Sequence, residues 1–232
     1  MSESLLLSSR DQHDHVVRRE LALKLDPGLI LQGDLAIPPN ALAVVIVPHT
    51  LRLPRDHHYN RAASDALIRR GLATLLLDCF TPAEKGSVRP AVGVTALASR
   101  LASATASLPE GTDLGVLPVG YLATTAQAGA VALLATGQAR GTVGAVVVIG
   151  IPSGLDLVAL ADAAAPTLLI GNASSEDFAR AASVQPFLAL DPHRLDMIPG
   201  VHTLASGDPG PHKRAFKRAG DWFIGHLPAL DP

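Results

Sequence analysis

The stretch Gly71-Leu72-Ala73-Thr74-Leu75-Leu76-Leu77-Asp78 carries the strongest structural signal in this sequence. Its apolar run is unbroken and ends at a carboxylate, which is typical of a strand buried on both faces of a parallel sheet. The run AVVIV at 43–47 has the same character. Between the two runs, residues 59–70 follow a helical pattern that closes at Gly71, a residue suited to ending a helix. Together these segments predict a β-α-β unit.

The same alternation extends outward from this unit. Further helical patterns cover 91–107, 126–136, 155–163, 176–184 and 211–226, and further strand patterns cover 114–121, 144–149, 166–170 and 194–198. Upstream, 16–25 and 29–37 resemble two strands joined by the turn Asp26-Pro27-Gly28. The predicted fold class is therefore α/β: a three-layer domain whose mostly parallel, twisted sheet begins with an antiparallel hairpin. We expect a flexible tail at 1–15 and one domain over 16–232. In such sheets, functional residues lie in the loops at the carboxyl ends of the strands.

Composition narrows the function classes. The 232 residues are 48% hydrophobic and 17% charged, with a net charge of −2, so the chain offers no positive field for nucleic acid. Cys79 is the single cysteine, which rules out an internal disulfide, and we interpret it as a buried apolar residue. No apolar run approaches the roughly 20 residues of a membrane span, and the N-terminal stretch lacks signal-peptide character. A cytoplasmic protein is expected.

No cofactor or metal site is predicted. The run Asp56-His57-His58 is the nearest approach to a metal cluster, with His49 close by in sequence. Adjacent side chains seldom point at one ion, so a solvated loop is the favoured interpretation of this run.

Several short motifs, in their order and spacing, resemble the dienelactone-hydrolase-like branch of the α/β-hydrolase superfamily. They are Pro48-His49-Thr50, GLATLLLD at 71–78, Val119-Gly120-Tyr121, APTLLIG at 165–171, IPGVH at 198–202 and DWF at 221–223. The resemblance covers roughly residues 30–227. It implies an α/β-hydrolase fold and a triad of Ser or Cys, an acid and His, with an oxyanion hole of two backbone N–H groups.

The nucleophile position is altered in this chain. The resemblance places Thr125 in the slot of the nucleophile, and Ala123 and Gln127 in the slots of the two glycines of G-x-S-x-G. The nucleophile of this motif sits on a strained turn with positive φ, to which a β-branched residue is poorly suited. The alternative interpretation is that Thr125 caps the helix that follows it.

The acid and the histidine are altered to different degrees. The positions that match the acid are Ser174 and Ser175, and Glu176 or Asp177 just afterwards would substitute. The same four residues are equally typical of a helix start, which is the favoured interpretation. The histidine is better preserved, since His202 follows Ile198-Pro199-Gly200 within about two residues of the family's base.

The oxyanion positions implied by the resemblance are Thr50 and Ala126, beside His49. The His-Gly pair of the family becomes His49-Thr50, and bulkier residues follow at 51–53.

Two functions follow from these residues, and a third idea is weaker. The favoured hypothesis is a pseudoenzyme: a hydrolase fold with a degenerate nucleophile elbow, weak or inactive in acyl transfer, that binds a small apolar ligand or a partner protein. The alternative is an active carboxylic-ester or lactone hydrolase that uses Thr125, His202 and Glu176 or Asp177. The weaker idea is a structural role in which 51–53 and Gln127 fill the ancestral cleft. The sequence leaves the oligomeric state open.

Overall fold

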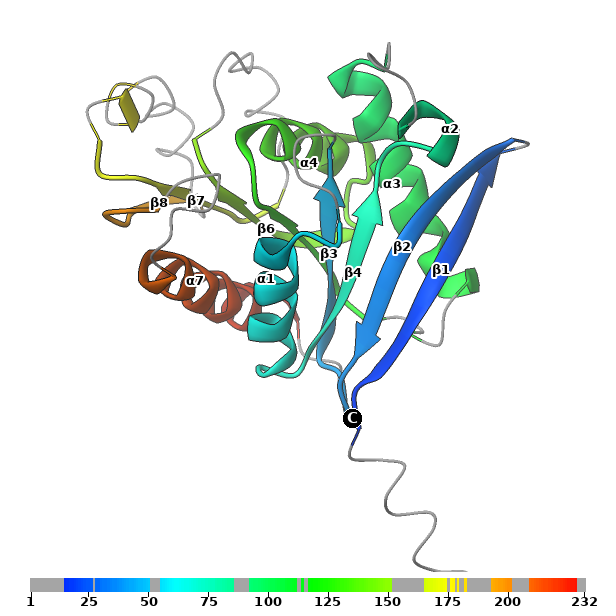
Figure 1. The fold of residues 1–232 in the computed structure, drawn as a ribbon, viewed down its shortest axis with the longest axis horizontal. Coiled ribbons are helices and arrows are strands. Elements are labelled where there is room, and N and C mark those ends of the chain that lie inside the picture. Colours follow the sequence, from blue (N-terminus) through cyan, green and yellow to red (C-terminus); the bar gives the residue numbers. More distant parts are fainter. Residues whose placement is uncertain are drawn as a thin grey trace, which may run out of the picture.

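The computed structural model describes residues 15–26, 28–50, 55–85, 92–111, 114, 117–151, 165–174, 176, 177, 179, 182, 193–201 and 209–228. Its strands and helices alternate after an initial pair of strands (Figure 1). In chain order they are β1 (Val17–Asp26), β2 (Leu29–Ile37), β3 (Ala43–His49), α1 (His58–Ile68), β4 (Leu72–Asp78), α2 (Pro82–Lys85), α3 (Val94–Gly111), β5 (Val119–Ala123), α4 (Ala126–Gln138), β6 (Val143–Ile149), β7 (Thr167–Gly171), β8 (Arg194–Met197) and α7 (Gly210–His226).

The strands form one eight-stranded sheet in the order β1-β2-β4-β3-β5-β6-β7-β8. β1 pairs with β2, and β2 with β4, in antiparallel fashion. Every other neighbouring pair is parallel. The predicted fold class is confirmed, including the antiparallel hairpin at the start.

Helices cover both faces of the sheet, which makes three layers. α1 and α7 pack beside each other on the face nearer the viewer in Figure 1, and α3 and α4 pack together on the other face. The central strands β3 and β4 are buried along their whole length, because helices cover both of their sides. β5 and α7 approach closely at Gly120, where an added Cβ would meet the Phe223 ring at 2.7 Å. Cys79 is fully buried, as predicted, and its burial raises the pKa of its thiol to about 12.

One predicted element differs from the structure in its bounds, and one short helix was not predicted. β5 begins at Val119 rather than at 114, because a turn in which the Leu117 N–H bonds to the Leu114 carbonyl precedes Pro118. The four-residue helix α2 was not expected. The helix predicted at 155–163 lies outside the described residues, as does most of the one at 176–184. None of the helices that the structure describes combines the length and apolar character needed to cross a lipid bilayer.

Candidate functional site

The carboxyl end of β5 runs directly into α4. Thr125 is the N-cap of this helix, and its Oγ1 accepts a hydrogen bond from the backbone N–H of Ala128 at 3.1 Å. The hydroxyl of Thr124 donates to Oδ1 of Asn60 at 3.1 Å, and both side chains are buried. Both threonine hydroxyls therefore have a structural partner, and the capping interpretation of Thr125 is confirmed.

The backbone at this point is relaxed. Thr125 has φ −141° and ψ 156°, which is extended conformation. Among the described residues, Asn40 is the only non-glycine with positive φ. Ala123 is buried at the end of β5, and Gln127 is exposed, so Gln127 does not fill a cleft. The strained bend of a nucleophile elbow is absent at Thr125, which removes the conflict between that bend and its branched side chain.

The carboxyl end of β3 carries buried polar groups with atoms that lack a hydrogen-bond partner within the described part of the chain. His49 and Thr50 are each 4% exposed. The His49 Nδ1 lies 2.7 Å from the Val47 carbonyl oxygen and donates to it, which leaves Nε2 as an acceptor. Burial lowers the pKa of His49 to about 4, so the ring is neutral at pH 7.

Three buried atoms have no hydrogen-bond partner among the described residues: Nε2 of His49 and Oγ1 of Thr50 at this end, and the hydroxyl of Tyr59 at the start of α1. Tyr59 lies at the start of α1, where its ring packs edge-on against His212 at 4.7 Å. More than nine in ten buried polar groups in proteins are bonded, so three together identify unsatisfied hydrogen-bonding capacity.

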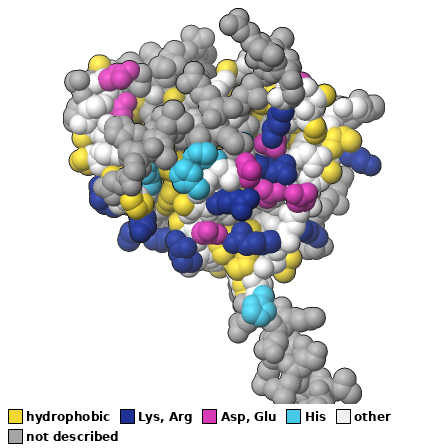
Figure 2. Space-filling model, viewed as in Figure 1, with side chains coloured by type: hydrophobic (Ala, Val, Ile, Leu, Met, Phe, Trp, Pro, Cys, Tyr) yellow, Lys and Arg dark blue, Asp and Glu magenta, His cyan; other side chains and the backbone are white. Residues whose placement is uncertain are grey.

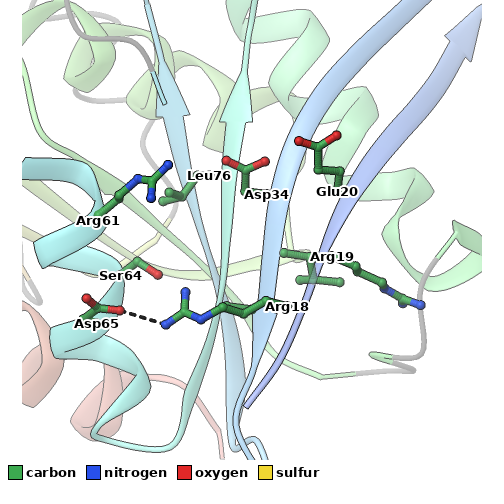
Figure 3. A pocket seen from close by; sticks show the side chains of 10 residues that line it. Arg18, Arg19, Glu20, Asp34, Arg61, Ser64, Asp65 and Leu76 are labelled. Carbon is green, nitrogen blue, oxygen red and sulfur yellow. Dashed lines mark hydrogen bonds and ion pairs between the residues drawn. The ribbon is translucent and has the colours of Figure 1, made fainter. Parts of the chain in front are cut away.

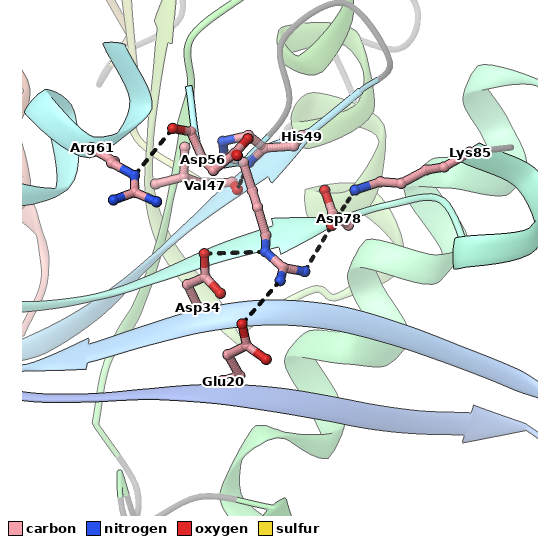
Figure 4. Close-up of polar contacts among 9 residues, drawn as sticks. Glu20, Asp34, Val47, His49, Asp56, Arg61, Asp78 and Lys85 are labelled. Atoms are coloured by element: carbon pink, nitrogen blue, oxygen red, sulfur yellow. Dashed lines mark hydrogen bonds and ion pairs between the residues drawn. The ribbon is translucent and has the colours of Figure 1, made fainter. Parts of the chain in front are cut away.

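A cluster of ion pairs adjoins β3 on the side of β4. Arg55 pairs with Asp78 at 3.0 Å and with Asp34 at 3.1 Å, and Glu20 approaches at 3.7 Å (Figure 4). Lys85 also pairs with Asp78, whose side chain is only 3% exposed. Burial works against the charge of Arg55, yet the carboxylates of Asp34 and Asp78 raise the pKa of its guanidinium. The cluster thereby ties the loop after β3 to β1, β2 and β4.

Two hollows lie over this part of the sheet. One, of about 460 Å³, is bordered by the ion-pair cluster together with Phe80 and Pro82. The other, of about 560 Å³, lies between α1 and the hairpin, where Arg18 pairs with Asp65 (Figure 3). Glu20, Asp34 and Arg61 border both hollows. Basic and acidic side chains are interspersed on this face of the molecule (Figure 2).

The segment after β7 is built from local caps. Asp177 accepts the backbone N–H of Asn172 at 2.6 Å, and its own N–H bonds to Oγ of Ser174 at 3.3 Å. Oδ1 of Asn172 accepts the N–H of Gly200, which ties this segment to the loop after β8. Glu176 is exposed on the helix that starts here. Both acids thus occupy a helix start, in agreement with the favoured interpretation of these residues.

The sheet brings some of the predicted site residues together. β3 and β5 are parallel neighbours, so Thr50 and the pair Thr125-Ala126 follow strand ends at the same edge. Glu176 lies five residues beyond β7, which is separated from β5 by β6. His202 and residues 51–53 lie outside the described residues, and their predicted roles stay predictions.

Sequence reasoning missed several groups at this edge. Asp78 was recognised as a strand end, but its partners Arg55 and Lys85 were not, since ion pairing across a loop leaves no periodic signal. Tyr59 was counted only as a helix residue. In the described part of the chain no group of three or more His, Cys, Asp or Glu side chains has metal-binding geometry. His57 instead accepts the N–H of Tyr59 as the cap of α1.

Comparisons with known proteins place this fold. No family model matches the chain. A dienelactone hydrolase from Anabaena variabilis ATCC 29413, known from its crystal structure, is 30% identical with a TM-score of 0.78, over 92% of this chain and 99% of that one. This chain belongs to the dienelactone hydrolase family. The resemblance inferred from the sequence is confirmed.

More distant neighbours of this dienelactone hydrolase family member share its fold. Est1E from Butyrivibrio proteoclasticus is 12% identical with a TM-score of 0.68, over 89% of this chain and 98% of its own. A cold-adapted esterase from an Arctic intertidal metagenomic library is 17% identical with a TM-score of 0.68, over 92% and 95%. At such identities the likeness concerns the α/β-hydrolase fold alone.

Two curated relatives carry a different name. They are Mycobacterium tuberculosis proteins, from strains CDC 1551 / Oshkosh and ATCC 25618 / H37Rv, provisionally named phosphoribosyl transferases. Each is 35% identical to this chain over 199 residues, which is 84% of this chain. The chain spans only 44% of the length of these relatives.

Proposed function

We propose that this member of the dienelactone hydrolase family is a pseudoenzyme, which binds a ligand at the carboxyl ends of β3 and β5 and does not catalyse acyl transfer. The observation that carries the proposal is the relaxed backbone of Thr125, whose hydroxyl caps α4. An acyl-transfer nucleophile needs its oxygen on a sharp turn, bonded to a base. Here that oxygen is held by the N–H of Ala128, and the exposed position of Glu176 gives little support to an acid in a triad.

The end of β3 supports the binding part of the proposal. Nε2 of His49 accepts hydrogen bonds, whereas the hydroxyls of Thr50 and Tyr59 both donate and accept. A ligand that is apolar throughout would leave these atoms unsatisfied. We therefore expect a small molecule with an apolar body and a hydroxyl or amide group that donates a hydrogen bond to Nε2 of His49.

The catalytic part of the proposal is tested with p-nitrophenyl acetate and butyrate. The wild-type chain and Thr125→Ala are expected to release p-nitrophenol at the same rate, close to that of buffer. Thermal unfolding of both proteins checks that they are folded. Turnover well above the buffer rate, lost in Thr125→Ala but kept in Thr125→Ser, would refute the pseudoenzyme proposal.

The binding part is tested separately by calorimetric titration with a small lactone and its ring-opened hydroxy acid. Tyr59→Phe and Thr50→Val are expected to weaken binding by about tenfold each, since each removes one hydrogen bond to the ligand. A matched control is Thr136→Val on α4, whose hydroxyl bonds to the Leu133 carbonyl within the helix. Equal affinity in all four proteins, or no binding by the wild type, contradicts this site.

The second candidate is an active ester or lactone hydrolase, which the family membership favours. Thr125 would be the nucleophile, His202 the base and Glu176 or Asp177 the acid. In that case His202→Ala and Thr125→Ala each lower kcat by about 10⁴-fold or more, and their effects are not additive. Comparison of the two single variants with the double variant separates this candidate from adventitious hydrolysis.

Phosphoribosyl transfer is not part of the proposal. The name belongs to relatives of which this chain spans 44%, and the described residues of this chain form a hydrolase sheet. Incubation with phosphoribosyl pyrophosphate is expected to release no pyrophosphate in the presence of free purine or pyrimidine bases. Release that depends on this chain would assign the relatives' named activity to it.

A further inference from the structure

The hairpin strand β1 forms one edge of the sheet. It spans ten residues, and in the described part of the chain it pairs only with β2 (Figure 1). Its outer side therefore presents a row of backbone N–H and C=O groups without a partner strand. Such an edge accepts a further strand unless its side chains or shape oppose pairing.

The side chains of β1 divide between its two faces. Arg18, Glu20, Ala22 and Lys24 are exposed and lie on the face of the two hollows, whereas Leu23 is buried on the α3 side. Glu20 is 80% exposed, and its contact with Arg55, at 3.7 Å, is long. Lys24 forms no ion pair among the described residues. Two opposite charges, four residues and about 13 Å apart along the strand, thus lie on the same face of the open edge.

The register of β1 with itself decides whether these charges attract. Alternate residues of β1 direct their backbone N–H and C=O groups outward, and the residues between them direct these groups toward β2. In a symmetric antiparallel pair, outward-directed residues must lie opposite outward-directed residues. A two-fold axis must therefore pass through a residue position and not between two residues. An axis at Glu20 places two glutamates opposite each other, and an axis at Leu21 places Arg18 opposite Lys24. An axis at Leu23 leaves Glu20 without a cation opposite.

Axes at Arg18, Arg19 and Lys24 each place two like charges opposite each other. Among positions 18–24 one register remains, with its axis at Ala22. It places Glu20 of each copy opposite Lys24 of the other, twice by symmetry, and Ala22 opposite Ala22 with no steric conflict. On the other face it places Leu21 opposite Leu23. Cross-strand pairs of opposite charge and of apolar residues both stabilise antiparallel sheets.

We propose that β1 pairs with β1 of a second copy of this chain, antiparallel and about a two-fold axis at Ala22. The partner is a second copy because the edge is self-complementary in charge, and an isologous contact of this kind closes as a dimer. The two sheets join into one, and the charged hollows of the two copies lie on the same face of the joined sheet.

Charge reversal tests this pairing, with the mass measured by light scattering after size exclusion over a concentration series. The wild type is expected to dimerise. Glu20→Lys and Lys24→Glu each place like charges opposite one another and should raise the dimer Kd by about tenfold or more. The double variant Glu20→Lys/Lys24→Glu restores the attraction and should return to within about threefold of the wild type. Lys213→Glu, an exposed reversal on α7, is the control and should change nothing.

Cysteine cross-linking tests the register itself. Ala22→Cys places two thiols across the axis, about 5 Å apart between Cα atoms, which is suitable for a disulfide. Lys24→Cys places the same thiols four residues apart along the strand, about 13 Å, and should not cross-link. A monomer at every concentration overturns the proposal. So does a dimer that is insensitive to both charge reversals, or one that cross-links at 24 and not at 22.

Discussion

Two neighbouring strand ends at the same edge of the sheet differ in the hydrogen bonding of their buried side chains. At the end of β5, the hydroxyls of Thr124 and Thr125 are both bonded, and the backbone is relaxed. At the end of β3, His49 and Thr50 are also buried, but each has an atom without a partner in the part of the chain that the structure describes. This difference is the basis of the binding proposal, because unsatisfied buried polar atoms reduce stability and are expected to be retained where a ligand satisfies them.

The two strand ends also differ in the contacts that support them. The end of β5 would carry the nucleophile in the family pattern, and here it works as a helix start. The end of β3 is instead held in place by the Arg55 cluster, which spans the hairpin, β4 and the loop. An intact support around the end of β3, beside a nucleophile position turned into a cap, fits a protein that binds without reacting.

The largest expected effect concerns the burial of neutral His49. Its pKa is about 4 in the folded chain and 6.5 in the unfolded one, so below pH 6.5 the unfolded chain takes up a proton that the folded chain refuses. The free energy of unfolding should therefore fall by about 3 kcal/mol between pH 6.5 and pH 4, at 1.36 kcal/mol per pKa unit. Urea unfolding at both pH values measures this loss.

His49→Asn is the matched variant, since its amide N–H can still donate to the Val47 carbonyl but does not titrate. The variant should lose most of the difference in the free energy of unfolding between pH 6.5 and pH 4. The exposed His58→Asn should leave that difference unchanged. If His49→Asn keeps the full loss, the pH dependence arises elsewhere and the end of β3 is more hydrated than the structure indicates.

The next effect concerns the support of this strand end. Arg55→Ala leaves buried Asp78 with Lys85 as its one charge partner among the described residues. Because Lys85 remains and Arg55 is partly exposed, the free energy of unfolding should fall by about 2 kcal/mol, less than for a fully buried pair. Arg18→Ala removes an exposed pair with Asp65 and should change it by less than about 0.5 kcal/mol. Urea unfolding of the two variants compares them directly. Equal losses would show that the Arg55 cluster is as weak as a surface pair.

The sequence predicted the scaffold far better than the site. The unbroken apolar runs at 43–47 and 72–77 predicted β3 and β4, because burial on both faces leaves a continuous pattern. The predicted start of β5 was wrong. Leu114 and Leu117 are apolar, as residues of a buried strand are, but they form a turn. The Arg55 cluster and the unsatisfied hydroxyl of Tyr59 depend on contacts between distant segments, which no local pattern encodes.

The smallest effects compare the two strand ends directly. Thr125→Ala removes the cap of α4 and should lower the free energy of unfolding by about 1 kcal/mol. Thr50→Val keeps the shape of a side chain whose oxygen has no partner among the residues that the structure describes, so it should leave that free energy unchanged or raise it slightly. Opposite signs, measured by urea unfolding without ligand, would support the assignment of β5 to structure and β3 to binding. A loss at Thr50 as large as that at Thr125 would mean that its hydroxyl is already satisfied within the folded chain, and the binding proposal would then lose one of its three groups.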